Sequence, residues 1–222
     1  MQSRRFQVRA RGPIACFTRP EMKAERVSYE VMTPSAARGL LEAILWKPAI
    51  HWHVHSIAVL SPIDWISFRR NEVADRASPK ILDFFADDPR RRAQRNTVAL
   101  RNVDYVITAS FALTDKAGPA DNLTKFEEMF DRRLRKGQSF QQPYLGCREF
   151  AAEVEPAPEE IRPIQSSADR PLGLMLYDFA YDPEGRGARP LFFEARLERG
   201  VLAVPPYKDV LRANARAEAP AR

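Results

Sequence analysis

The chain has few cysteines, histidines and glycines and no long apolar run. Its 222 residues include only two cysteines, Cys16 and Cys147. Two thiols so far apart form neither a zinc-ligand spacing nor a disulfide framework, so we expect both to be reduced residues that fill space. No apolar stretch approaches the roughly 20 residues of a membrane helix, and no apolar segment of a signal peptide follows residues 1–5. These absences predict a soluble, cytoplasmic protein.

The composition is that of a globular protein with a basic surface. Apolar residues make up 45% of the chain, which is enough to bury a core, and 25.3 kDa allows one domain with an appendage or two small domains. The formal charge is +6 and the pI is near 9.5, with arginine far more frequent than lysine. Because the planar guanidinium matches phosphate oxygens and stacks on bases, this excess favours a polyanionic partner such as nucleic acid.

Hydrophobic periodicity predicts six elements in the first 154 residues. Period-two alternation indicates strands, and apolar residues three and four positions apart indicate helices. Thr33 or Ser35 can cap the first helix, Asp121 or Thr124 begins the second, and Gly137 ends it. The order is strand 6–18, helix 36–45, strand 50–60 with a hairpin partner at 63–69, strand 98–113, helix 121–136 and strand 145–154. This order is typical of a ferredoxin-like, RRM-type domain, with both helices on one face of an antiparallel sheet.

A basic segment around residues 71–96 interrupts this pattern. It has little periodicity and contains Arg90, Arg91 and Arg92, so we expect a long, mobile insertion. The arginines either contact backbone phosphates or belong to a solvated loop. If they neutralise several phosphates, binding depends strongly on salt.

The C-terminal part predicts a second, smaller unit. Residues 155–171 are rich in proline and acidic side chains and read as a linker. Strands are expected at 172–181, 191–198 and 201–204, and residues 213–222 as a frayed tail. The predicted fold is therefore α+β: a ferredoxin-like domain at 1–154 followed by a small antiparallel β-sheet subdomain at 172–212.

Several sequence blocks, spread in order over nearly the whole chain, resemble one family. The blocks are Phe17-Thr18-Arg19-Pro20-Glu21, Glu25-Arg26-Val27-Ser28-Tyr29, Pro34 to Gly39, Trp46-Lys47-Pro48, Arg69 to Glu72, Leu100 to Tyr105, Gly137 to Phe140, Leu145 to Glu149 and Pro190 to Phe193. Together they are similar to the CRISPR-associated Cas-five family of the RAMP superfamily, and most of all to its type I-C branch, subtype d.

The resemblance implies a concrete activity. Such proteins have an RRM-like domain followed by a small antiparallel sheet. They cut precursor CRISPR RNA at the base of the repeat hairpin without metal, and they stay on the 5′ handle within the type I-C effector complex. The implied partners are therefore repeat RNA and the other subunits of that complex, with duplex DNA as a further candidate, and no cofactor is expected.

RNA can be cut without metal because its own 2′-hydroxyl attacks the adjacent phosphorus. The products are a 2′,3′-cyclic phosphate and a free 5′-hydroxyl, and DNA lacks this nucleophile. A positioned base contributes on the order of 10²–10⁴-fold, and preorganised cations stabilise the charge of the phosphorane.

The resemblance carries one catalytic residue to this chain. The family has a tyrosine or histidine at the end of the first helix and a Gly-Lys-His start to the second. Here Lys125 matches the lysine, whereas Leu45 and Phe126 occupy the other two positions and cannot transfer protons. These departures leave open a second hypothesis, a non-catalytic subunit that binds the 5′ handle.

Three alternate histidines offer a replacement for the missing base. His51, His53 and His55 lie in an expected strand and therefore share one face, and neutral histidine is a suitable base near pH 7. They can equally lie on a solvated or RNA-facing surface without a catalytic role. A third hypothesis, a metal-dependent nuclease, uses the same residues as zinc ligands.

The expected RNA contacts come from basic and aromatic residues of the matching blocks and of the basic insertion. They are Arg19, Arg26, Tyr29, Lys47, Arg69, Arg70, Arg90, Arg91 and Arg92.

Overall fold

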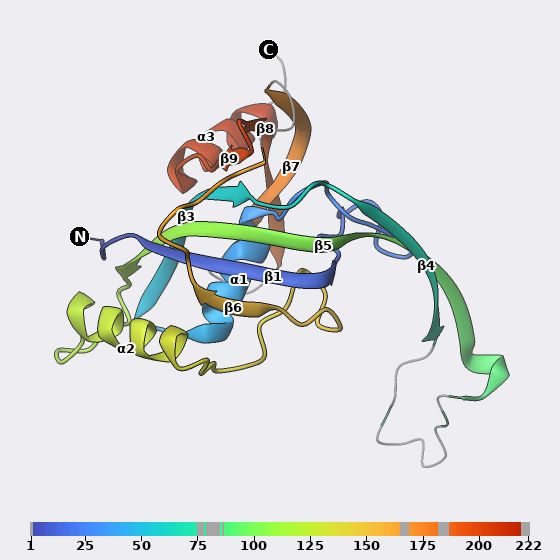
Figure 1. Ribbon diagram of the computed structural model, residues 1–222, viewed down its shortest axis with the longest axis horizontal. Helices are drawn as coiled ribbons and strands as arrows, with labels where there is room; N and C mark the ends of the chain where they lie inside the picture. The colour runs from blue at the N-terminus through green and yellow to red at the C-terminus, as the bar shows by residue number, and fades with distance from the viewer. Residues whose placement is uncertain are drawn as a thin grey trace.

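The computed structural model describes residues 2–74, 78, 85, 87–164, 169–181 and 187–218. Strands dominate its architecture, and three α-helices pack around them (Figure 1). In chain order the elements are β1 (Phe6–Ala15), β2 (Arg26–Val27), α1 (Pro34–Ile44), β3 (Ile50–Val59), β4 (Trp65–Val73), the 3-10 turn η1 (Pro89–Arg91), β5 (Arg92–Leu113), α2 (Leu123–Arg135), β6 (Glu153–Pro156), β7 (Arg170–Tyr181), β8 (Ala188–Glu198), β9 (Val201–Ala203) and α3 (Tyr207–Glu218).

The strands form one large, mainly antiparallel sheet, which confirms the predicted α+β class. Its order is β6-β1-β5-β3-β9-β8-β7, and β2 and β4 pair with the first part of β5. The long strand β5 is central, since it pairs with β1, β3 and β4 antiparallel and with β2 parallel. The expected hairpin between residues 50–60 and 63–69 is wrong: β3 pairs with β5 and β9, and β4 continues along β5.

Local sequence signals account for the helix ends. The hydroxyl of Thr33 accepts a hydrogen bond from the amide of Ala36 at 3.2 Å and so caps α1. The cap of α2 is Asn122, rather than Asp121 or Thr124, and its side chain accepts from the Lys125 amide. Gly137 follows α2 with a φ of +61°, a backbone conformation that glycine adopts without strain. No helix within the described ranges is long and apolar enough to cross a membrane.

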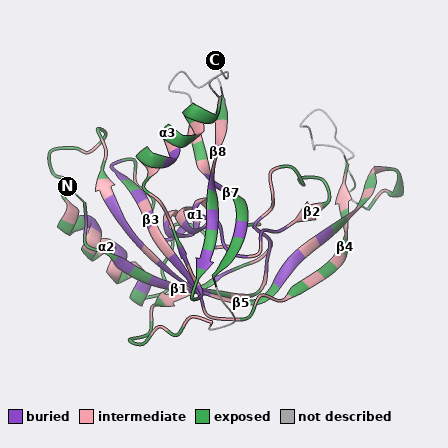
Figure 2. Cartoon of the chain, turned by 90° about the horizontal axis from the view of Figure 1, so that it is seen from above, coloured by how far each residue is buried: buried purple, intermediate pink, exposed green. Residues whose placement is uncertain are grey.

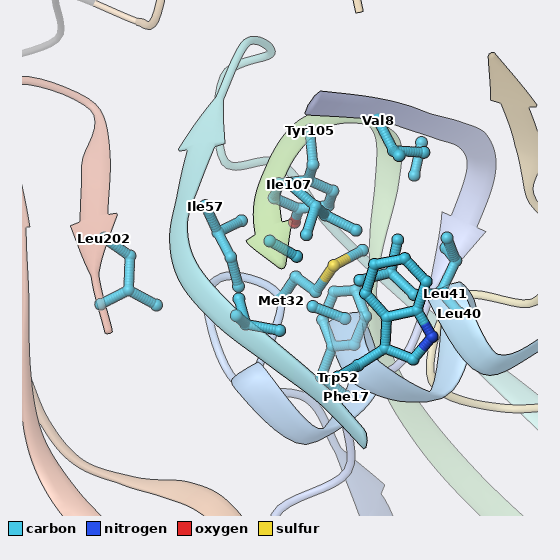
Figure 3. Packing of buried hydrophobic residues seen from close by; sticks show 14 of the residues in the cluster. Val8, Phe17, Met32, Leu40, Leu41, Trp52, Ile57, Tyr105, Ile107 and Leu202 are labelled. Atoms are coloured by element: carbon cyan, nitrogen blue, oxygen red, sulfur yellow. The ribbon is translucent and has the colours of Figure 1, made fainter. Parts of the chain in front are cut away.

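The core lies between the sheet and the helices α1 and α2 (Figures 2 and 3). Trp52 of β3 meets Phe111 of β5 edge-on at 5.0 Å and Phe130 of α2 at 4.7 Å between ring centroids. Leu40 and Leu41 of α1 are buried beside them. Burying such large side chains removes apolar area from water and anchors both helices against the sheet.

The two ends of the basic insertion are ordered strands, since β4 continues to Val73 and β5 begins at Arg92. β4 pairs with β5 from Trp65↔Leu100 to Val73↔Arg92, and this two-stranded ribbon projects from the body of the molecule (Figure 1). Sequence periodicity predicted the inner parts of both strands, at 63–69 and from 98, but missed their outer ends. The side chains of β4 alternate between exposed and half-buried, and the outer ends are largely polar, so apolar alternation does not mark them. Residues 75–77, 79–84 and 86 of the predicted insertion lie outside the described residues.

The predicted strand at 145–154 is largely a turn. Only β6 (Glu153–Pro156) and a single bridge between Tyr144 and Ala151 pair there. Gly146 explains the difference, since its φ is +84° and a Cβ at this position would approach the carbonyl oxygen of Cys16 to 2.1 Å. Close backbone packing therefore determines the conformation of this segment, and such packing has no local sequence signature.

The C-terminal part differs from expectation at both ends. β6 extends past the expected boundary at residue 154, and β7 begins at Arg170, inside the predicted linker, of which residues 165–168 lie outside the described part. The expected frayed tail from residue 213 is helical as far as Glu218 in α3. Asn214 explains this order, because its amide group accepts from the Phe192 amide at 3.0 Å and donates to the Phe192 carbonyl at 2.7 Å.

Candidate functional site

A small cluster of charges lies where the segment after α1 meets the start of α2. The ammonium of Lys125 donates to the Asp121 carboxylate at 2.9 Å, and Asp121 also accepts from the Gly118 amide at 3.0 Å. The hydrogen bond from Lys125 is the main cause that lowers the pKa of Asp121, and nearby Lys47 lowers it further. We call Lys47, Asp121 and Lys125 the lysine site. It holds two cations and one oriented carboxylate at the solvent boundary.

Leu45 and Phe126 are both core residues. Leu45 is fully buried and its carbonyl accepts from the indole nitrogen of Trp52 at 3.2 Å. Phe126 is 2% exposed and belongs to the core cluster. These two positions therefore supply packing, and neither offers a proton to the lysine site.

Two exposed aromatic rings meet beside the end of α1. Trp46 directly precedes Lys47, and its ring centroid lies 6.1 Å from that of Phe140, with an angle of 31° between the planes. The carbonyl of Ala43 accepts from the Phe140 amide at 2.8 Å. We call Trp46 and Phe140 the aromatic pair.

The histidines do not join Lys125. Trp52 points toward Phe130 of α2, and strand side chains alternate, so His51, His53 and His55 leave β3 on the opposite face. In the described part of the chain, no hydrogen bond or ion pair links them to the lysine site. Burial is the main cause that lowers the pKa of all three, to about 4 for His53. A group with so low a pKa is uncharged at neutral pH and is a weak base.

The three rings also fail to converge on one point. His51 and His53 are 5.0 Å apart between centroids, whereas the Nε2 atom of His55 is hydrogen-bonded to Ser110 at 2.8 Å. Among the described residues there is no group of three or more histidine, cysteine or acidic side chains placed to hold a metal ion.

A cleft of about 490 Å³ opens between α1, β7 and the segment after β1. Its wall carries Arg19, Lys23 and Arg38, and Arg38 is held by Asp178 at 2.6 Å and by Glu42 at 2.7 Å. The volume is in the range of small-ligand sites, and the wall is mixed in charge because Glu42 and Asp178 line it beside Arg38. Aromatic residues also line it, namely Phe17, Tyr144, Phe179 and Tyr181.

Tyr29, predicted to contact RNA, lies in the core and is only 1% exposed. Its hydroxyl accepts from the Leu176 amide at 3.2 Å, and burial raises its pKa. The guanidinium of Arg19 lies 4.5 Å from the centre of the Tyr29 ring. Tyr29 therefore supports Arg19 from within the core.

Arg26 and Arg70 lie at the base of the ribbon in one ionic network. Both donate to the Glu149 carboxylate, at 2.7 and 3.0 Å, and both have Glu72 nearby. Arg70 also donates to the Thr97 hydroxyl at 2.8 Å. These arginines are thus largely used to join the ribbon to the turn at 145–150.

The remaining predicted arginines lie along the ribbon. Arg69 is exposed on β4. Arg90, Arg91 and Arg92 lie at the far end, where Asp88 holds Arg90 at 3.0 Å and approaches Arg91 at 3.8 Å. The ribbon therefore places these cations away from the body of the protein. In the sequence they are well separated from the residues of the lysine site.

The two cysteines, expected to be reduced residues that fill space, lie side by side. The Cys147 sulfur accepts from Arg26 at 3.2 Å and lies 3.5 Å from the Cys16 carbonyl oxygen, and the Thr18 hydroxyl approaches both sulfurs at 3.5 and 3.8 Å. A hydrogen bond from the Cys16 thiol is the main cause that lowers the pKa of Cys147, and Arg26 adds to it. The same hydrogen bond, together with burial, raises the pKa of Cys16.

Alkylation should distinguish the two thiols. Because the reactive species is the thiolate, iodoacetamide should label Cys147 in the folded protein at a lower pH than it labels an ordinary cysteine, and should leave Cys16 unlabelled. Peptide mass spectrometry after a short pulse measures both sites. Unfolded protein is the control, in which both cysteines should require a pH near 8.5. Labelling of Cys147 only above pH 8 in the folded chain would contradict this assignment.

Sequence reasoning missed two features of the surface, the partner of Lys125 and the aromatic pair. Asp121 precedes Lys125 by four residues, a spacing that predicts an ion pair on a helix and was a usable signal. Trp46 and Phe140 gave no such signal, because 94 positions separate them in the chain and only the fold joins them.

Comparison with known proteins identifies close relatives. The family model for Cas5d, described as CRISPR-associated protein (Cas_Cas5), matches residues 6–205. The CRISPR pre-crRNA endoribonuclease Cas5d of Mannheimia succiniciproducens is 45% identical over 219 residues, which are 91% of this chain and 96% of the relative. The protein of the same name from Thermus thermophilus is 44% identical over 220 residues, 92% of this chain and 93% of the relative.

Solved structures share the fold at lower identity. A crystal structure of a CRISPR-associated protein superimposes with a TM-score of 0.72 at 24% identity and covers 94% of this chain and 95% of its own. A chain of a CRISPR RNA-guided surveillance complex gives a TM-score of 0.51 at 15% identity, over 96% of this chain and all of its own.

Proposed function

Because this chain belongs to the Cas5d branch of the CRISPR-associated Cas5 family, we propose that it is a pre-crRNA endoribonuclease that cuts the CRISPR repeat at the base of its hairpin. Its close relatives over nine-tenths of the chain bear the name of that activity. The observation that carries the assignment of a site is Lys125, the family lysine, held by Asp121 in the first turn of α2 beside Lys47.

The proposed reaction uses the nucleophile of the RNA. The 2′-oxygen bonds to the adjacent phosphorus, the bond from phosphorus to the 5′-oxygen breaks, and the 5′-oxygen takes a proton. Lys125 and Lys47 neutralise the negative charge that builds on the phosphoryl oxygens, which is the role of preorganised cations. Asp121 positions Lys125. Since Leu45 and Phe126 transfer no proton, water removes the proton of the 2′-hydroxyl, and the protein contributes alignment and charge.

The arrangement of strands supports an RRM-like reading of the first part. β6, β1, β5 and β3 are neighbours in this order, and α1 and α2 connect β1 to β3 and β5 to β6. This is the succession of a ferredoxin-like unit, and it makes the first 154 residues, extended through Pro156, the proposed RNA-processing domain. β7, β8, β9 and α3 form the proposed second unit, of which residues 172–212 are the predicted core.

The proposed RNA path joins the lysine site, the cleft at Arg19 and the ribbon. Arg69, Arg90, Arg91 and Arg92 offer charges that phosphates can meet, whereas Arg26 and Arg70 act mainly through their contacts with Glu149. After cutting, the chain stays on the 5′ handle and joins the other subunits of the type I-C effector complex. Duplex DNA is a further candidate ligand of the same basic surface.

A non-catalytic, handle-binding subunit is the second candidate, favoured by the buried Leu45 and Phe126. The two candidates separate when the purified chain is incubated with labelled repeat RNA in excess chelator. We expect one cut, with a 2′,3′-cyclic phosphate on one product and a 5′-hydroxyl on the other, both identified by mass spectrometry. Tight binding with no cut over hours would select the second candidate. Activity that vanishes with chelator and returns with zinc or manganese would instead favour a metal-dependent reaction.

A further inference from the structure

Trp46 and Phe140 are unusual among the large aromatic residues because they are exposed and yet touch each other. Trp46 is 49% exposed and Phe140 is 62% exposed, and their rings lie 6.1 Å apart. Two large rings exposed at one point leave apolar area in water, whereas burial of such area stabilises the core. Such a contact at the surface is a suitable platform for another flat, apolar group.

The fold holds the aromatic pair in place from behind. The amides of Phe140 and Gln141 both donate to the Ala43 carbonyl, at 2.8 and 3.1 Å, and Arg133 donates to the Ile44 carbonyl at 2.7 Å. The last carbonyls of α1, which a helix leaves without partners, are therefore used to bind the segment after α2. The platform is preorganised, so little conformational entropy is lost when a ligand binds.

The charge around the aromatic pair identifies the ligand as a nucleic acid. Lys47 follows Trp46 directly and belongs to the lysine site, while Arg135 and Lys136 precede Phe140 at the end of α2 and make no ion pair with any described residue. A flat apolar surface among cations matches a base flanked by phosphates. An aliphatic peptide has no such anions.

We infer that the aromatic pair is a base-stacking subsite, which holds a nucleotide next to the scissile phosphate and thereby positions that phosphate at Lys125. This inference rests on the proposed function and names the substrate contact that complements the lysine site. Every base has a flat face, so stacking is tolerant of sequence. The subsite therefore fixes register along the strand and leaves the choice of repeat to other contacts.

Substitution of the pair and deletion of one base should have the same effect. Trp46→Ala and Phe140→Ala should each lower kcat/KM for repeat RNA by on the order of tenfold, the usual scale of one base–aromatic stack. Trp46→Phe should retain most of the activity because it keeps a ring. Leu174→Ala removes an apolar side chain of similar exposure, 60%, from β7, and should cut as the parent does. Thermal unfolding checks that each variant is folded.

An abasic scan then locates the base. Repeat RNAs with a single abasic nucleotide near the cut should include one that the parent cuts about tenfold more slowly, and for that RNA Trp46→Ala should cause no further loss. The inference would be overturned if Trp46→Ala lowered the cutting rate by the same factor on every abasic RNA. It would also be overturned if Trp46→Ala cut the unmodified repeat RNA at the parent rate. If normal cutting accompanies failure to bind other subunits, the pair is a protein-docking surface instead. Lys125→Ala tests the proposed function separately, because it removes a cation proposed to act in cleavage and leaves the base-stacking residues in place.

Discussion

A single 2′-deoxy substitution in the ribose that precedes the scissile phosphate should abolish cleavage of repeat RNA. The proposed reaction takes its nucleophile from that hydroxyl, so its removal leaves no attacking oxygen, while nearly all contacts of the strand remain. We expect the rate to fall below detection in single-turnover assays, a loss of at least about 10⁴-fold, and the affinity to change by less than about threefold. Gel-shift titration and denaturing gels measure the two quantities on the same RNA.

The matched control places the same 2′-deoxy substitution two nucleotides away. That RNA should be cut at the parent rate, because the remote hydroxyl takes no part in bond formation. Normal cutting of the first RNA would refute attack by the 2′-oxygen and would point to an activated water as the nucleophile.

Lys125→Ala should slow cutting strongly and leave binding nearly unchanged. A cation placed for the developing phosphorane charge typically contributes about 10²–10³-fold to kcat, whereas one exposed lysine adds little to the affinity for a long polyanion. We therefore expect a loss on the order of 10²-fold in single-turnover rate at saturating protein, with a similar Kd. A change in rate without a change in affinity identifies an interaction made in the transition state.

The chain offers a matched control on another helix. Lys208 is an exposed lysine in the first turn of α3, so Lys208→Ala removes the same charge from an equivalent local position and should leave cutting unaffected. Unchanged cutting by Lys125→Ala, together with loss in His53→Ala, would move the active site to the histidines of β3.

Local interactions explain how much of the fold could be predicted. The cap at Thr33, the apolar stripe of α1 and the left-handed Gly137 after α2 involve residues within a few positions of one another. The outer end of the ribbon, at residues 70–73 and 92–97, escaped prediction because it is largely polar, so apolar alternation in the sequence is weak there. The whole of α3 escaped prediction, since residues up to 212 were assigned to the β-sheet subdomain and the rest to a frayed tail, and the bond from Asn214 to Phe192 that holds it depends on the fold.

The candidate site divides in the same way. Lys125 was found by resemblance, and Asp121 could have been found from its spacing of four residues. The spacing of His51, His53 and His55 correctly implies a shared strand face, but no rule of spacing reveals that Trp52 turns this face away from α2. Burial of Tyr29 likewise depends on β7, from which Leu176 reaches its hydroxyl.

The amino-acid order alone thus established the α+β class, the helices α1 and α2 and the family of this chain, because capping, periodicity and family-like sequence blocks are properties of short segments. Tertiary folding joined Cys16 to Cys147, Trp46 to Phe140 and Arg70 to Glu149. Partners of this kind come from segments that are remote in the chain, and their meeting follows from how the sheet and helices pack rather than from any short-range preference of the residues.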